Sequence, residues 1–145
     1  MKDRIESSVD ITASRARVWE LVSEPGWWIN TGTLGGHRIE RSGAEWTVTD
    51  ATLGAFTVGV VALEPMTRAV FTWQPGGDDV PRTTVEFTLT NVDPDTVRVS
   101  VVESGFAQMD PDQHRRNYGD NVSGWTEELG LLRQRSERES DAPRP

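Results

Sequence analysis

The chain has 145 residues, with 15 Lys and Arg against 23 Asp and Glu, which gives a formal net charge of −8. This length favours a single domain, and the acidic charge argues against binding to nucleic acid or to an anionic membrane surface. The sequence has no cysteine, which excludes disulfides, thiolate metal sites and a cysteine nucleophile. It shows neither a signal peptide nor a membrane-spanning apolar run, so we expect a cytoplasmic protein.

The N-terminal part of the chain predicts one strand and two short helical pieces. Apolar and polar residues alternate from Ile5 to Ile11, which is the pattern of a half-buried strand. Ser14 offers an N-cap for a short helix, and the proline of Pro25-Gly26 ends it. The segment Trp27–Ile29 is predicted either as a second short helix or as a packed loop.

Residues 37–106 contain only strand patterns, separated by short turns rich in Gly, Pro and Asp. These connections are too short for the crossover that joins parallel strands, so we predict an antiparallel meander. With the first strand the sheet has seven strands, and the other six are predicted at His37–Ser42, Glu45–Thr52, Ala55–Glu64, Ala69–Gln74, Thr83–Asn91 and Thr96–Ser104.

A long amphipathic helix is predicted after the sheet. Asp110 suits the N-cap, Pro111 the first helical position, and Gln113 the capping-box position. Past Arg133 we expect a frayed helix end, and over residues 139–145 a disordered tail, which leaves residues 1–138 as one domain. Apolar residues recur at helical spacing along the helix, namely Tyr118, Val122, Trp125, Leu129 and Leu132.

These elements predict an α+β fold. A sheet with one buried face needs a cover, and the last helix is the only long amphipathic element available. Because one helix is much narrower than seven strands, the sheet must curve around it. We expect two short helices between the first and second strands to plug one side. A curved sheet that grips one helix leaves a gap, in which we expect a ligand cavity.

Short pieces of sequence resemble a known family in their order and spacing. They are Ile11-Thr12-Ala13-Ser14, Arg68-Ala69-Val70-Phe71-Thr72-Trp73, Thr84-Val85-Glu86-Phe87, Glu103-Ser104-Gly105-Phe106 and Gly124-Trp125. In these pieces the sequence resembles the START and birch-pollen-allergen superfamily, also called SRPBCC, whose members have the helix-grip fold. Within that superfamily it resembles the activator of Hsp90 ATPase homologues.

The resemblance implies a protein that binds a hydrophobic or aromatic small molecule. Relatives with this architecture include polyketide cyclases and dehydratases, so an enzyme that uses the same cavity for acid–base chemistry is the alternative. The name-giving co-chaperone has an additional N-terminal domain, for which this chain is too short. Stimulation of a heat-shock ATPase is therefore the least favoured function.

The alternation of side chains along the strands and the spacing along the last helix predict which residues form a binding site. The aromatic candidates either line the cavity or fill it as ordinary core; they are Trp46, Phe71, Trp73, Phe87 and Trp125. On the last helix, His114, Tyr118 and Asn121 lie on one side.

Glu103 is the one candidate for a catalytic acid or base. In the predicted strand it lies on the same face as Val97, Val99 and Val101, so we expect its side chain to point inward. We expect it near the N-terminal turns of the last helix, where backbone amides at Asp112 and Gln113 stabilise a carboxylate. A salt bridge at the strand end is the competing interpretation.

The sequence also predicts which cofactors and partners to expect. Only two histidines and no cysteine are present, and no phosphate-loop motif is found, so we expect no metal and no cofactor. The expected partner is a hydrophobic small molecule, and a homodimer is kept open.

Overall fold

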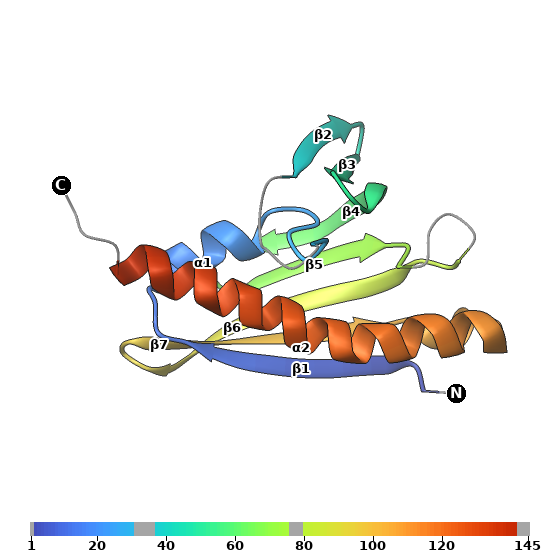
Figure 1. Ribbon diagram of the computed structural model, residues 1–145. Coiled ribbons are helices and arrows are strands. Elements are labelled where there is room, and N and C mark those ends of the chain that lie inside the picture. Colours follow the sequence, from blue (N-terminus) through green and yellow to red (C-terminus); the bar gives the residue numbers. More distant parts are fainter. Residues whose placement is uncertain (1, 31–36, 76–79, 142–145) are drawn as a thin grey trace.

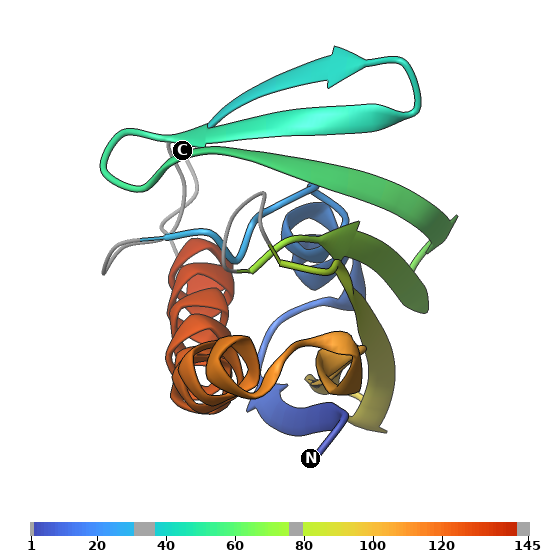
Figure 2. The same cartoon turned by 90° about the vertical axis from the view of Figure 1, so that its right-hand side faces the viewer.

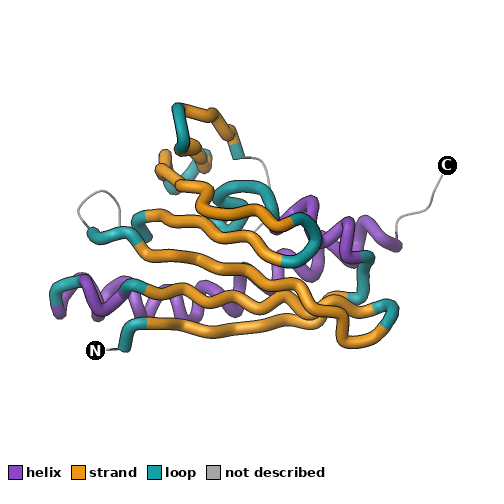
Figure 3. The backbone as a smooth tube through the Cα atoms, turned by 180° about the vertical axis from the view of Figure 1, so that it is seen from behind, coloured by secondary structure: helices purple, strands orange, loops and turns teal. Residues whose placement is uncertain are grey.

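The computed structural model describes residues 2–30, 37–75 and 80–141, except for the side chains of residues 139–141. In this part of the chain, seven strands form one antiparallel sheet in the order β1-β7-β6-β5-β4-β3-β2. The predicted antiparallel meander is therefore confirmed (Figures 1 and 3). The strands are β1 (Arg4–Ile11), β2 (Arg38–Ser42), β3 (Glu45–Asp50), β4 (Gly54–Glu64), β5 (Arg68–Trp73), β6 (Thr83–Asp93) and β7 (Thr96–Ser104).

The long helix α2 (Pro111–Asp141) lies across the concave face of the sheet. Figure 2 shows the sheet bending from β1 round to β2, with both helices inside the bend, so the predicted curvature is confirmed. The start of α2 is the expected capping box: Gln113 N donates to Asp110 Oδ1 at 2.8 Å, and Asp110 N donates to Gln113 Oε1 at 3.2 Å.

The far end of α2 differs from the sequence prediction. Instead of fraying past Arg133, the helix continues to Asp141, because this turn still packs on the body of the protein. Ser136 is buried, and the Glu137 carboxylate accepts a hydrogen bond from the backbone N–H of Thr12 at 2.9 Å. The domain boundary and the tail stay predictions, since residues 142–145 lie outside the described residues.

Between β1 and β2 the described residues form one helix, not two. Helix α1 (Arg15–Val22) begins at the predicted N-cap Ser14. The second expected helix is replaced by a turn over residues 25–28. Gly26 explains the turn: its φ is +72°, and an added Cβ would lie 2.7 Å from a methyl carbon of Val48. Only glycine meets both conditions at low cost.

The core lies between the sheet and the two helices. Alternate residues of β6 and β7 face it, as their period-2 pattern predicts. A 3-10 helix, η1 (Phe106–Gln108), links β7 to α2 and buries Phe106. On α2, Trp125, Leu129 and Leu132 are buried as predicted, whereas Val122 is exposed and leaves the stripe. None of the helices in the described part of the chain has the length and hydropathy needed to cross a lipid bilayer.

Candidate functional site

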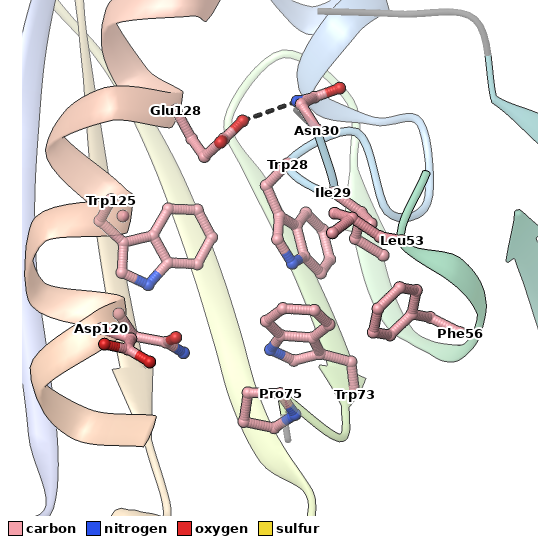
Figure 4. A pocket seen from close by; sticks show the side chains of 12 residues that line it. Trp28, Ile29, Asn30, Leu53, Phe56, Trp73, Pro75, Asp120, Trp125 and Glu128 are labelled. Atoms are coloured by element: carbon pink, nitrogen blue, oxygen red, sulfur yellow. Dashed lines mark hydrogen bonds between the residues drawn. The ribbon is translucent and has the colours of Figure 1, made fainter. Parts of the chain in front are cut away.

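A cavity of about 360 Å³ lies between α2, β5 and the segment that follows the residue 25–28 turn. The turn between β3 and β4 closes another side. Figure 4 shows the lining side chains, which are mostly apolar or aromatic. The lining consists of Trp28, Ile29, Asn30, Leu53, Phe56, Trp73, Pro75, Asp120, Asn121, Gly124, Trp125 and Glu128.

Three tryptophans and one phenylalanine form the aromatic wall of this cavity. Trp28 packs edge-on against Trp73, with ring centroids 5.6 Å apart, and lies 6.0 Å from Trp125. Phe56 continues the wall at 5.9 Å from Trp73. Aromatic clusters of this kind are rigid and supply a large apolar contact area.

Glu103, on β7, accepts hydrogen bonds from two tryptophans of this wall. Its side chain is completely buried. Trp125 Nε1 donates to Oε1 at 2.8 Å, and Trp73 Nε1 donates to Oε2 at 2.9 Å. Asn121 Nδ2 also donates to Oε1, at 2.9 Å, and the Thr83 hydroxyl donates to Oε2. Four neutral donors therefore satisfy both carboxylate oxygens.

The inward orientation predicted for Glu103 is confirmed, but its expected neighbours were wrong. It contacts the middle of α2, at Asn121 and Trp125, rather than the amides of the first turn. Among the described residues, its hydrogen-bond partners are neutral side chains of β5, β6 and α2, and none of them is an arginine. The reason is register, because Glu103 pairs with Val85 and Ile5 in the sheet, beneath the centre of the helix.

Glu128 forms the polar end of the cavity. Asn30 Nδ2 donates to Glu128 Oε1 at 2.6 Å, and the same amide nitrogen donates to the carbonyl oxygen of Trp27 at 2.7 Å. Burial raises the pKa of Glu128 to about 7, against the opposing effect of the Asn30 hydrogen bond, and the like charge of Glu127 adds to the rise. This carboxyl group therefore changes charge near neutral pH.

The ring nitrogen of Trp28, a residue of the cavity lining, is a second polar feature beside the cavity. Trp28 is only 4% exposed. Its buried Nε1 has no hydrogen-bond partner among the described residues. A buried N–H donor without an acceptor is costly.

The structure brings three of the nine sequence-predicted residues to the cavity: Trp73, Asn121 and Trp125. Phe71 and Phe87 are completely buried and fill the core beside Trp28. They are core residues, which is the alternative that the sequence left open.

The other predicted residues lie away from the cavity lining. Trp46 stands on β3, where the Arg41 guanidinium lies 5.9 Å from its ring centroid. His114 Nε2 lies 2.6 Å from the carbonyl oxygen of Lys2, and Tyr118 donates its hydroxyl to the carbonyl oxygen of Arg4 at 3.1 Å. The first turns of α2 thus dock on the N-terminal strand.

Sequence reasoning missed Trp28, Asn30 and Glu128. A signal for Glu128 existed, because it follows Asn121 by seven residues and therefore shares its side of α2. Asn30 and Trp28 carry no such signal, since they lie after an irregular turn. Within the described residues, no group of three or more His, Asp or Glu side chains could hold a metal ion.

Comparison with known proteins places this geometry in a family. The family model described as Activator of Hsp90 ATPase homolog 1-like protein matches residues 12–137. Protein MLL2253 from Mesorhizobium loti is 24% identical with a TM-score of 0.66, covering 90% of this chain and 94% of its own. The Aha1 dimer from Colwellia psychrerythraea is 17% identical with a TM-score of 0.67, covering 94% and 97%.

A third structure is DynU16, described as a putative protein in the dynemicin biosynthetic locus. It is 23% identical with a TM-score of 0.70, and the match covers 97% of this chain and 49% of that one. Comparison with curated proteins finds no match. At these identities the solved structures show the shared helix-grip fold.

Proposed function

Because the chain belongs to the family of Activator of Hsp90 ATPase homolog 1-like proteins, we propose that it binds an apolar small molecule between the sheet and α2. The observation that carries the proposal is the aromatic cavity of about 360 Å³. Ligand sites are typically concave, mostly apolar and fitted with a few polar groups. This cavity has that composition, with Glu128 and Asn30 at one end.

A binding role accounts for the carboxylates better than acid–base catalysis does. Glu103 accepts four hydrogen bonds, so its oxygens are occupied by the scaffold. The enzyme alternative then rests on Glu128, whose pKa of about 7 suits a general acid or base. Acid–base chemistry on one reacting atom usually needs a second positioned group. Asn30, the partner of Glu128, does not titrate. Asp120, the other carboxylate of the lining, lies eight residues earlier on α2, roughly 12 Å along the helix axis.

Two further predictions accompany this proposal. A cytoplasmic location and a homodimer stay predictions from the sequence. The relative from Colwellia psychrerythraea is described as a dimer, which supports the second of them. Neither prediction is needed for a ligand to enter the cavity, because the lining residues named above belong to one chain.

The experiment fills the cavity from α2 and measures binding of N-phenylnaphthylamine, a neutral probe that fluoresces in apolar surroundings. Gly124 lines the cavity, and an added Cβ there would meet nothing within 4 Å. Gly124→Leu should therefore fit the helix and occupy ligand space. We expect the dissociation constant of the probe to rise about tenfold or more.

Gly119→Leu is the matched control. Gly119 lies on the same helix, also has open space around an added Cβ, and is not among the lining residues. Both substitutions gain similar helix propensity, roughly 1 kcal/mol. Equal probe affinities of the two variants, or no fluorescence gain with the unmodified protein, would contradict a ligand site here.

A further inference from the structure

The charged groups that line the cavity are all acidic. Glu128 and Asp120 contribute carboxylates, and the described lining includes no Lys, Arg or His. The whole chain carries a formal net charge of −8, so the surrounding potential also favours cations. An anionic ligand would therefore enter this cavity at an electrostatic disadvantage.

The aromatic wall favours the same sign of charge. The faces of tryptophan and phenylalanine rings attract ammonium groups, and this attraction grows when the cation is removed from water. Trp28, Trp125 and Glu128 meet at one end of the cavity, as Figure 4 shows. A carboxylate beside aromatic faces is a chemical match for an organic cation.

Trp28 adds a second and independent requirement. Figure 4 shows its ring between the Glu128–Asn30 pair and Trp73, with the ring nitrogen on the side of Trp73. This buried N–H has no partner among the described residues. A ligand that reaches past Glu128 would satisfy it with an acceptor such as an ether or carbonyl oxygen.

We propose that the cavity selects an arylalkylamine: an apolar aromatic ring body with an oxygen acceptor for Trp28 and a protonated alkylamine that pairs with Glu128. The inference rests on the proposed function, since it names the ligand class of the same site. No covalent step is involved, and the amine stays protonated throughout.

Protonation of Glu128 distinguishes this ligand from a neutral one. Asn30 donates a hydrogen bond to Glu128, and Glu127, exposed beside it on α2, adds a like charge. Asp120 is the other carboxylate of the lining, and the described lining adds no positive charge. An ammonium group would favour the carboxylate form and lower the pKa of Glu128 from about 7. Amine binding at pH 7 should then release protons, because a pKa of about 7 leaves part of the carboxyl population protonated before binding.

The experiment compares three ligands of nearly equal shape by titration calorimetry: naphthyloxyethylamine, naphthyloxyethanol and naphthyloxyacetate. All three carry the ether oxygen and differ in charge. We expect the amine to bind about tenfold more tightly than the alcohol, and the acid to bind most weakly. Titrations in two buffers of different ionisation enthalpy should show proton release for the amine and none for the alcohol.

Glu128→Gln is the test variant, and Glu127→Gln, the same charge change one residue away on the exposed side, is its control. We expect Glu128→Gln to remove the preference for the amine and the proton release, while the alcohol binds within about twofold. Glu127→Gln should keep the preference for the amine, and a smaller proton release should remain, because Glu127 makes only the lesser contribution to the raised pKa of Glu128. Alcohol and amine binding equally overturns the inference but leaves the proposed function intact. Failure of all three ligands and of N-phenylnaphthylamine contradicts both.

Discussion

Replacement of Glu103 tests whether this buried carboxylate holds the aromatic wall together. In Glu103→Leu, four donors lose their acceptor. The Asn121 amide is only partly buried and can turn to water, and the Thr83 hydroxyl can rotate, so the cost falls on the indole N–H groups of Trp73 and Trp125. An unsatisfied buried donor costs about 1–3 kcal/mol, which gives about 4 kcal/mol for the two.

Glu103→Gln should cost about half as much. The two indoles donate to different carboxylate oxygens, Oε1 and Oε2. An amide has one oxygen and one NH₂ group, so in either orientation one indole faces a donor. We therefore expect a loss of about 2 kcal/mol. Free energies of unfolding from urea titrations, with unchanged m values, measure both losses. Losses below about 0.5 kcal/mol in both variants would refute the anchoring role.

Two further predictions concern stability. The pKa of Glu128 is about 7 in the folded protein against 4.5 as its ordinary value, so the folded state binds more protons and its stability should fall as pH rises from about 4.5 to 7. Glu128→Gln should match the unmodified protein near pH 4.5 and exceed it at pH 8, by about 1 kcal/mol after solvent screening; urea titrations at both pH values measure this, and a variant that is less stable at pH 8 would contradict it. Gly26→Ala should cost about 2–4 kcal/mol, because it adds a clash with Val48 to the strain of a positive φ. Gly43→Ala, at φ +64° with open space around it, should cost only about 1 kcal/mol, so equal thermal unfolding shifts in the two variants would count against the packing argument.

Much of the fold was predictable because its signals are local. The alternation of apolar and polar residues in β6 and β7 predicts which side chains of these strands are buried. The capping box at Asp110 predicts the start of α2 within one residue. What each turn of α2 packs against was harder to predict. His114 and Tyr118 lie on the right side of the helix, but this part of α2 covers the start of β1 rather than the cavity. Helical spacing gives a direction around the helix and does not say what lies opposite each turn.

The candidate site depends on tertiary packing that periodicity does not encode. In the sequence, Glu127-Glu128 is an ordinary acidic pair on a helix surface. Glu128 becomes partly buried only because the irregular segment after Gly26 places Asn30 against it. The place of Trp28 in the cavity also depends on tertiary packing, since its neighbours Trp73 and Trp125 come from a strand and a helix far along the chain. The cavity therefore follows from where one turn packs.

Glu103 and Glu128 have opposite environments at the cavity, and this difference assigns their roles. Glu103 receives hydrogen bonds from β5, β6 and α2, so the folded chain supplies everything its oxygens require. Glu128 receives one hydrogen bond, from Asn30, and burial raises its pKa to about 7. A carboxylate that receives few hydrogen bonds from the protein is stabilised most by a ligand that brings a hydrogen-bond donor or a positive charge. Selection among ligands should therefore occur at Glu128, while Glu103 keeps Trp73 and Trp125 in the positions that such a ligand contacts.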